Sequence, residues 1–184
     1  MTHALLIRGA AVVLTGWGGA RARADADCVR IRDGLIQELG RDLAPYSDEE
    51  VVTVRDCVIY PGWINTHHHL FQSVMKGVPA GINQPLMGWL GATPYPRLFR
   101  MDAELLEVSA TIGLVELLMS GTTTCADHHY VYHADIPPES ADVLFEVAER
   151  LGMRLVLCRG GATEGGRHPD YPSRIVAETV EGIT

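Results

Sequence analysis

The pentapeptide Asn65-Thr66-His67-His68-His69 ends an apolar segment that begins at Cys57. In a β-strand, residues two apart lie on the same face. His67 and His69 can therefore converge on one metal ion, while His68 points the other way. Imidazole nitrogen is a suitable ligand for zinc and for iron. The pattern predicts a site for one divalent metal ion, zinc or alternatively iron, although a histidine-rich turn without metal fits the same motif.

Composition narrows the class of protein around this motif. The chain has 184 residues, of which 47% are hydrophobic and 21% charged, which is typical of a globular protein with a sizeable core. The net charge of −8 disfavours nucleic acid or an anionic membrane surface as the main partner. The four cysteines are scattered without a CxxC pair, which favours a reducing compartment. No apolar run approaches the ~20 residues of a membrane span, so we expect a cytoplasmic protein.

The chain is expected to divide near residue 60. Before it, short apolar segments rich in β-forming residues predict a small β unit with little catalytic content. The clearest signal is Asp33-Gly34, because this dipeptide tolerates the positive φ angles of a type I′ hairpin turn. The expected strands are 4–7, 11–14, 29–32, 35–39 and 51–54.

After residue 60, strand and helix signals alternate. This order predicts parallel strands joined by right-handed crossovers. In the helix over 101–120, Asp102 is the expected N-cap and Gly121 follows the last turn. Its expected buried stripe is Leu105, Val108, Ile112, Val115 and Met119. The remaining elements are strands over 58–65, 122–126 and 154–158 and helices over 140–151 and from residue 173 to 180.

Polar side chains follow the carboxyl end of each expected strand. His67 and His69 follow the first, Asp127 to Tyr130 the second, and Arg159 the third. Active sites of (β/α)8 barrels are built at that face. An open doubly wound sheet is the alternative, but the glycine-rich phosphate loop usual in such sheets is absent. The sequence therefore predicts an α/β fold with the first three strands of a partial (β/α)8 (TIM) barrel. The long connection over 77–96 is expected to form a lid or binding loop, with a plain surface excursion as the alternative.

Several stretches together resemble the amidohydrolase superfamily. The segment over 60–73 resembles its metal-binding signature, and the segments 76–81, 89–95, 120–128 and 158–163 resemble its aminohydrolase branch, which deaminates purines, pteridines and triazines. The resemblance implies a TIM barrel over 58–184, preceded by a β-sandwich segment over 1–57. It also implies hydrolytic deamination of an amino-substituted N-heterocycle with release of ammonia. The substrate would be a pterin or an oxopurine, such as isoxanthopterin or 8-oxoguanine.

Four side chains are candidates for substrate binding. Gln72 resembles a substrate-contacting glutamine of the family, and its amide offers a donor and an acceptor to a lactam edge. A local backbone cap is its alternative role. Trp89 could stack on a flat heterocycle or simply pack within the lid. Arg159 could grip a substrate carbonyl or form a surface ion pair. His128, with Asp127, is expected to line the pocket or orient a metal ligand, whereas His129, His133 and His168 are expected to be solvent-exposed.

The catalytic groups of the family have no counterpart in this sequence. The resemblance implies a further His with a nearby Glu, a second His and an Asp on later strands. A complete barrel needs about 250 residues, whereas about 125 follow residue 60. We therefore expect an N-terminal portion of a longer enzyme, possessing two metal ligands and no catalytic acid or base, and forming a homodimer when complete. A partial product that relies on a second chain, another hydrolase such as a triazine chlorohydrolase or cyclic amide hydrolase, and a non-catalytic metal-binding fragment are the alternatives.

Overall fold

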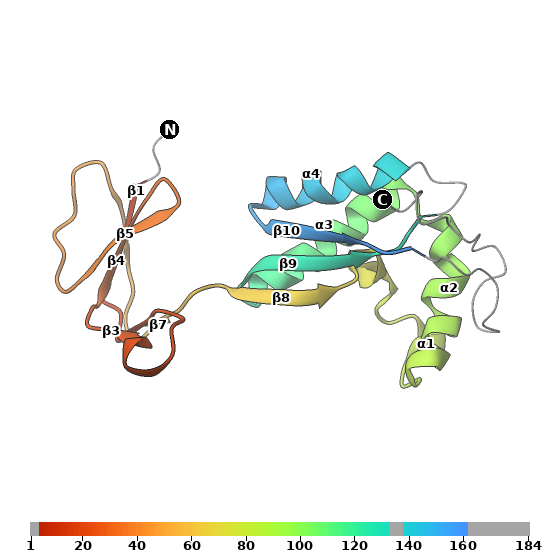
Figure 1. The fold of residues 1–184 in the computed structure, drawn as a ribbon, viewed down its shortest axis with the longest axis horizontal. Coiled ribbons are helices and arrows are strands. Elements are labelled where there is room, and N and C mark those ends of the chain that lie inside the picture. The colour runs from red at the N-terminus through yellow and green to blue at the C-terminus, as the bar shows by residue number, and fades with distance from the viewer. Residues whose placement is uncertain (1–3, 133–137, 162–184) are drawn as a thin grey trace. The chain divides into compact units, whose positions relative to one another are not determined.

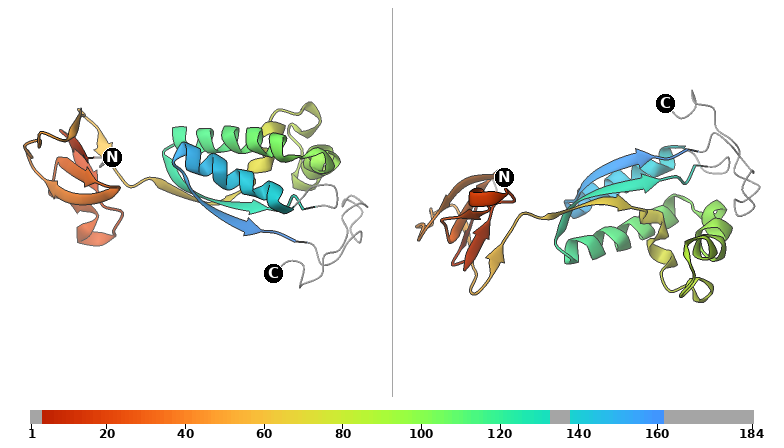
Figure 2. Two further views of the ribbon diagram at one scale, coloured as in Figure 1. Left: turned by 90° about the horizontal axis from the view of Figure 1, so that it is seen from above. Right: turned by 60° about the horizontal axis from the view of Figure 1, so that its bottom comes forward.

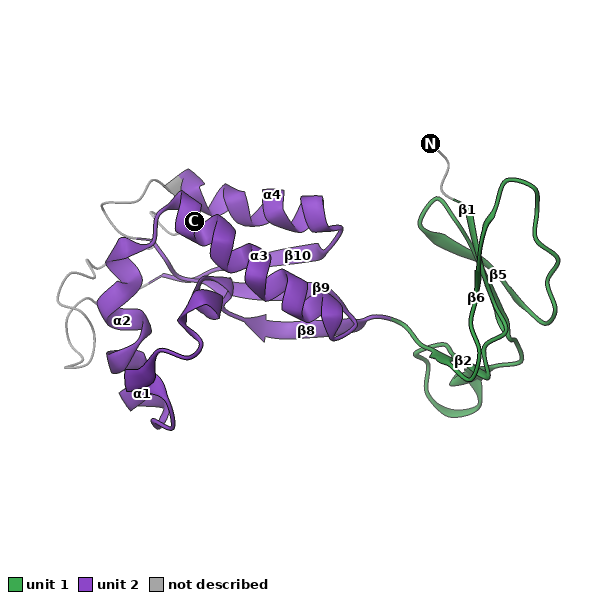
Figure 3. Cartoon of the chain, turned by 180° about the vertical axis from the view of Figure 1, so that it is seen from behind, with its two compact units in different colours: residues 1–61 green, residues 62–184 purple. Residues whose placement is uncertain are grey.

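A computed structural model of the chain describes residues 4–132 and 138–161. It forms two compact units, residues 1–61 and residues 62–184 (Figure 3). The expected helix from residue 173 lies outside the described residues, as do His3, His133 and His168. None of the described helices combines the length and the apolarity that crossing a membrane requires.

The first unit is built from two small sheets. One has the strand order β5-β4-β1-β6 and the other the order β3-β2-β7. Asp33 and Gly34 have φ angles of 51° and 77° between β4 and β5, so the positive φ values expected for this hairpin are confirmed. The strands are β1 (Ala4–Arg8), β2 (Val12–Leu14), β3 (Arg23–Ala24), β4 (Cys28–Arg32), β5 (Leu35–Gly40), β6 (Glu50–Thr53) and β7 (Val58–Ile59), with a short 3-10 helix η1 (Gly19–Arg21).

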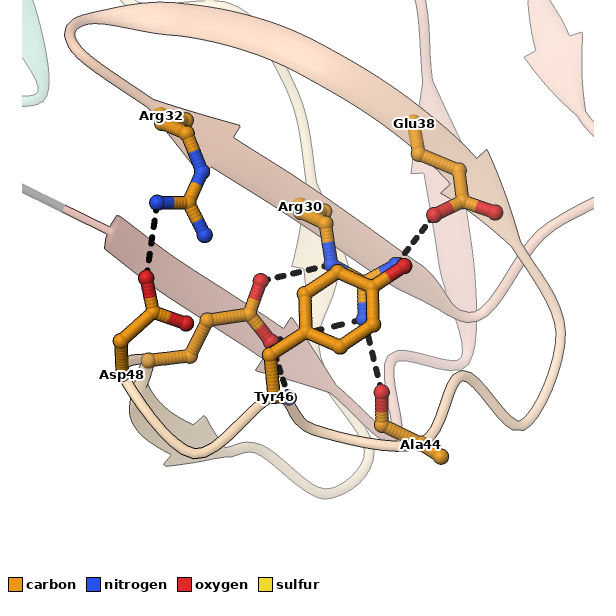
Figure 4. A network of polar contacts seen from close by, with 7 residues as sticks. Arg30, Arg32, Glu38, Ala44, Tyr46 and Asp48 are labelled. Carbon is orange, nitrogen blue, oxygen red and sulfur yellow. Dashed lines mark hydrogen bonds and ion pairs between the residues drawn. The ribbon is translucent and has the colours of Figure 1, made fainter.

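A buried arginine links β4 to β5 and to the loop before β6 (Figure 4). Arg30 is 5% exposed, and its Nε donates to Glu49 Oε1 over 2.6 Å. Its guanidinium also pairs with Glu38, donates to the Ala44 carbonyl oxygen over 2.7 Å, and lies 4.0 Å from the centre of the Tyr46 ring. Because a buried charge is costly unless it is paired, this network lets β4 carry an arginine inside the unit.

The second unit contains a parallel sheet with the strand order β8-β9-β10 within the described residues (Figure 1). β8 (Trp63–His68), β9 (Thr122–His129) and β10 (Arg154–Arg159) pair in parallel. Helix α3 (Ala103–Met119) connects β8 to β9, and α4 (Asp142–Leu151) connects β9 to β10. Both helices cover the same face of the sheet (Figure 2). The predicted alternation of parallel strands and helices is thus confirmed.

The expected continuous strand over 58–65 is wrong. The chain leaves β7 at Ile59 and enters β8 at Trp63, so the two parts belong to different sheets. Pro61 lacks the N–H that a central strand would donate. Gly62 approaches the Thr123 side chain so closely that a Cβ would lie 2.3 Å from it. The Tyr60-Pro61-Gly62 segment therefore breaks the strand rather than continuing it.

The core of the second unit lies between the sheet and its helices. Cys125 of β9 is buried against Leu114 of α3 and Leu144 of α4. The Asp102 cap is confirmed, since its Oδ1 accepts from the Leu105 N–H over 2.8 Å. The expected buried stripe of α3 is wrong except at Leu105, which is partly buried and packs against the core. Apolar residues occur all around this helix, and the opposite side is the one that is buried. Its buried residues are Leu106, Ser109, Ala110, Gly113 and Leu114, whereas Val108, Ile112, Val115 and Met119 are exposed.

The long connection between β8 and α3 is folded into short helices. They are η2 (Leu70–Met75), η3 (Pro79–Gly81), α1 (Leu86–Ala92), α2 (Pro94–Arg97) and η4 (Leu98–Arg100), and η5 (Pro138–Ala141) precedes α4. Gly81 allows Trp89 of α1 to pack back on the connection, because a Cβ at residue 81 would lie 2.9 Å from the indole ring. The connection is therefore ordered around Trp89.

Candidate metal site

The two predicted ligands lie where β8 ends in a bulge. Asn65 is paired with Cys125 and His68 with Asp127, so β8 advances three residues where β9 advances two. The Asn65 side-chain oxygen accepts the His67 N–H over 2.9 Å and holds the extra residue in place. Strict strand alternation, on which the prediction was based, is therefore interrupted immediately before the histidines.

His67 and His69 nevertheless face each other. Their Nε2 atoms are 3.3 Å apart, and their ring planes are nearly perpendicular at 88°. Two imidazole nitrogens bound to a tetrahedral zinc ion at about 2.0–2.1 Å would be about 3.3–3.4 Å apart. The separation of the two nitrogens therefore fits two ligands of one ion.

The neighbouring strand fixes the tautomer of His69. Its Nδ1–H donates to the carbonyl oxygen of His128 over 2.7 Å, which leaves Nε2 without a proton on the side of His67. Burial lowers the pKa of His69 more than this hydrogen bond raises it. The neutral imidazole, which is the form that binds metals, is therefore favoured.

His128 contacts the predicted ligands and is not among the residues that line the cavity described below. Its ring stacks on His67 with centroids 4.4 Å apart and planes 12° apart. Its Nε2 lies 3.2 Å from the Thr66 carbonyl oxygen, to which it can donate. The structure thus places His128 against His67, and its role stays a prediction.

His68 points the other way, toward α3, as predicted. A Cβ at Gly113 would lie 3.3 Å from His68 Nε2 and 2.4 Å from Ser73 Oγ, so glycine is required at this contact. Both polar atoms are buried without a hydrogen-bond partner in the part of the chain that the structure describes. Burial lowers the pKa of His68.

Asp127 holds the residue that follows the second ligand. Its Oδ1 accepts the Leu70 N–H over 2.7 Å, and its side chain is fully buried. Burial raises the pKa of Asp127 to about 6. His129, expected to be exposed, is instead fully buried, with Nδ1 3.8 Å from Asp127 Oδ2. Residues two apart share a strand face, so Asp127 and His129 lie on the same face of β9 as the core residue Cys125. Burial lowers the pKa of His129 to about 4.

An open cavity of about 230 Å³ adjoins the histidine pair. The Gln72 side chain lies on its wall and donates through Nε2 to the Tyr130 hydroxyl over 2.8 Å. Trp89 also lines the cavity, so the long connection does supply part of its wall. The lining residues are His67, His68, His69, Gln72, Ser73, Lys76 and Trp89.

Arg159 lies at the end of β10 and is not among the cavity-lining residues. Its guanidinium carbon is 4.2 Å from the centre of the Tyr132 ring, and its Nη1 donates to the Gly160 carbonyl oxygen over 2.9 Å. The structure thus brings His67, His69, Gln72 and Trp89 together around the cavity. His128 stacks on His67 outside the cavity lining, and Arg159 does not line the cavity. Sequence reasoning missed Tyr130, whose only signal was its place directly after a strand that ends in polar residues.

Within the described residues, the histidine pair belongs to no larger group of potential metal ligands. Among residues 4–132 and 138–161, no group of three or more His, Cys, Asp or Glu side chains is arranged to hold a metal ion. This part of the chain therefore offers two imidazoles to an ion that normally takes four ligands in a tetrahedral site.

Comparison with known proteins gives consistent matches. The model of the amidohydrolase family matches residues 58–181. Isoxanthopterin deaminase from an unknown prokaryotic organism is 46% identical over 180 residues, which are 96% of this chain and 37% of that protein. 8-Oxoguanine deaminase from Pseudomonas aeruginosa is 40% identical over 156 residues, which are 83% of this chain and 34% of that protein. The chain thus spans just over a third of the length of these relatives.

A solved structure matches with similar extent. The atrazine chlorohydrolase of Arthrobacter aurescens TC1, complexed with zinc, superposes with a TM-score of 0.80 at 26% identity. The match covers 97% of this chain and 40% of that protein. The likeness therefore includes both compact units of the chain.

Proposed function

This chain belongs to the amidohydrolase family, and from that premise we propose that it forms part of a metal-dependent deaminase that hydrolyses an amino-substituted N-heterocycle and releases ammonia. The observation that carries the proposal is the His67–His69 pair, with Nε2 atoms 3.3 Å apart beside an open cavity. The names of the relatives, isoxanthopterin deaminase and 8-oxoguanine deaminase, support this reaction and a pterin or oxopurine substrate.

His67 and His69 would hold one divalent ion, zinc in the first instance and iron as the alternative. Such an ion supplies Lewis-acid activation of water at neutral pH. The chain's own contribution is to hold two neutral imidazoles in place: the His128 carbonyl oxygen fixes His69, and the stacked His128 ring supports His67. Asp127 holds the backbone directly after His69. We propose that the remaining ligands, and the acid and base that move protons, come from outside the present sequence.

Gln72 and Trp89 would position the substrate. Both line the cavity, and both suit a flat ring with a lactam edge: an amide donates and accepts, and an indole face stacks. Arg159 would grip a substrate carbonyl only if its guanidinium left the Tyr132 ring, so we assign it a weaker role than Gln72. His128 would act from behind the ligands rather than on the substrate.

The architecture proposed for the complete protein follows from the family. The three parallel strands would be the first of a (β/α)8 barrel over 58–184, and residues 1–57 would belong to a small β-sandwich domain. We propose a cytoplasmic enzyme that acts on a small heterocycle and assembles as a homodimer. Nucleic acid and membrane are not proposed as partners, in line with the net charge of −8.

A chlorohydrolase that acts on a triazine is the second candidate. The observation that favours it is the structural match to the zinc-bound atrazine chlorohydrolase. Both reactions use activated water on an electron-poor ring carbon, and they differ in the leaving group. A metal-binding chain without turnover is the remaining alternative.

The test is product analysis with the complete protein loaded with zinc. We expect ammonia from isoxanthopterin or 8-oxoguanine and no chloride from a chlorinated triazine. Chloride release without ammonia would replace the proposal with the second candidate, and no turnover of any of these compounds would contradict both. If the isolated 184 residues deaminated a pterin at a rate typical of enzymes, the expectation that catalytic groups lie outside this sequence would be wrong.

A further inference from the structure

We propose that Tyr130 is a positioning residue that sets the orientation of the Gln72 amide, and thereby the preference of the cavity for a heterocycle with a lactam edge. This inference rests on the proposed function and deepens it. The observation is the hydrogen bond from Gln72 Nε2 to the Tyr130 hydroxyl over 2.8 Å.

A glutamine side chain needs such a partner if its amide is to present the same end, donor or acceptor, to every substrate molecule. Its amide carries a donor nitrogen and an acceptor oxygen of nearly equal size, and its three rotatable bonds lose entropy when the side chain is fixed. Because the nitrogen donates to Tyr130, the carbonyl oxygen is placed on the other branch of the amide. The hydroxyl therefore determines which end of the amide a ligand in the cavity meets.

The Tyr130 ring is itself held by aromatic neighbours. Its centroid lies 4.9 Å from that of Phe71, with an interplanar angle of 83°. It lies 5.2 Å from the His69 ring, with an interplanar angle of 78°. Phe71 is fully buried. The hydroxyl of Tyr130 is thus presented from a fixed ring, and the same ring abuts a predicted metal ligand.

Tyr130 also completes a pattern of contacts between two segments. The Asp127 carboxylate accepts from the Leu70 N–H, and the His128 carbonyl oxygen accepts from His69 Nδ1. Tyr130 then contacts Gln72 from the residue just after β9. The end of β9 therefore holds the backbone, the metal-ligand ring and the substrate-binding amide of one short segment, 69–72, in a single arrangement.

A merely structural tyrosine would behave differently from this one. Packing against Phe71 and His69 needs only the ring, which phenylalanine would supply equally well. In the proposed role, the hydroxyl acts through its hydrogen bond with Gln72 Nε2. Tyr130→Phe therefore isolates the proposed role, because it keeps the aromatic contacts and removes one hydrogen-bond acceptor.

The experiment compares four forms of the complete zinc-loaded enzyme: wild type, Tyr130→Phe, Gln72→Ala and the double variant. With the pterin substrate, we expect Tyr130→Phe to raise KM about tenfold with a smaller change in kcat, since one hydrogen bond corresponds to roughly that factor. In the Gln72→Ala background, Tyr130→Phe should have no further effect, because the two residues would act as one unit. Zinc content should equal that of the wild type in all four forms. Tyr46→Phe, in the other compact unit, is the matched control and should leave KM unchanged.

An unchanged KM in Tyr130→Phe, or additive effects in the double variant, would overturn the inference while leaving the deaminase proposal in place. Equilibrium binding of the pterin, followed by its own fluorescence, gives a readout that does not need turnover. Weaker binding by Tyr130→Phe in an enzyme that binds pterin without releasing ammonia would support the inference while contradicting the proposed reaction. A wild-type enzyme that does not bind the pterin would overturn both.

Discussion

Two clusters of buried polar side chains differ in how many of their polar atoms have a hydrogen-bond partner. In the β unit, Arg30 is 5% exposed and each part of its guanidinium meets a carboxylate, a carbonyl oxygen or a ring. On β9, Asp127 and His129 are fully buried, yet Asp127 Oδ2 and both ring nitrogens of His129 have no hydrogen-bond partner among the described residues. The first cluster belongs to the other compact unit, whereas the second lies on β9, the strand that contacts His69 and Leu70.

We interpret this difference as one between polar residues that stabilise the fold, such as Arg30, and polar residues that support the candidate metal site, such as Asp127. Buried polar groups are nearly always paired, so unpaired ones in one place call for an explanation other than stability. Here the atoms without a partner belong to Asp127, which contacts Leu70, and to His129, which follows the residue that contacts His69. We therefore interpret the β9 cluster as a feature retained for the site at a cost in stability.

Breaking the Arg30 network should have the largest effect on stability. Arg30→Ala leaves the carboxylate of Glu49 buried without its partner, so the midpoint of thermal unfolding should fall by more than about 5 °C. Arg32→Ala removes an ion pair whose side chains are 28% (Arg32) and 57% (Asp48) exposed, and it should change the unfolding midpoint little. Zinc affinity should stay the same in both variants. Equal unfolding midpoints in the two variants would mean that the buried Arg30 network contributes no more to stability than the exposed Arg32–Asp48 pair.

Removing the Asp127 carboxylate should weaken metal binding without unfolding the protein. Asp127→Ala deletes the acceptor of the Leu70 N–H beside His69, and changes in the groups that orient a ligand typically cost about 10–100-fold in metal affinity. Asp127→Asn keeps an oxygen acceptor and is the matched control. Competition with a zinc chelator measures both affinities. An unaltered affinity in Asp127→Ala would show that this contact does not position the ligand.

The pH dependence of stability should reveal the burial of Asp127 and His129. Asp127 has its pKa raised from 3.8 to about 6, so its contribution makes the folded state less stable as pH rises through that window. His129 has its pKa lowered from 6.5 to about 4, so its contribution makes the folded state less stable as pH falls through that window. In the wild type the two slopes oppose each other.

Asp127→Asn leaves only the slope of His129. The free energy of unfolding should then rise with pH between 4 and 6.5 more steeply than in the wild type, and the variant should be more stable at pH 7 by about 1–3 kcal/mol. Urea unfolding at several pH values gives the measurement. Asp25→Asn, at a side chain 89% exposed, is the control that should follow the wild type. Identical profiles for Asp127→Asn and the wild type would contradict the assignment of a buried carboxylate with a raised pKa.

Much of the fold followed from local signals that are physically independent of their surroundings. Asp33-Gly34 specifies its own turn. Asp102 and Gly121 mark the two ends of α3, the first through the N–H that its side chain accepts and the second through its φ angle of 86°. The buried side of α3 could not be predicted in this way, because a helix with apolar residues on all sides carries no periodic signal. The strand break at Pro61-Gly62 was missed because an apolar run looks continuous even where two sheets divide it.

The two candidate metal ligands could be predicted from the sequence, whereas the contacts that hold them in place could not. His67 and His69 stand out by spacing alone. The bulge at Asn65, the burial of His129 and the contact between Tyr130 and Gln72 depend on how β9 lies beside β8, and residues 57 to 60 apart in sequence give no local signal of that. Tertiary pairing determined these contacts.

Zinc binding by single-histidine variants of the complete protein tests the central claim most directly. The measurement is the amount of zinc retained per protein during dialysis against a chelator of known affinity. If His67 and His69 are two ligands of one ion, His67→Ala and His69→Ala should each lose binding by at least about 100-fold, since each removes a direct ligand. His68→Ala, whose ring points toward α3, should retain it. Full zinc retention by His67→Ala or His69→Ala would contradict the account.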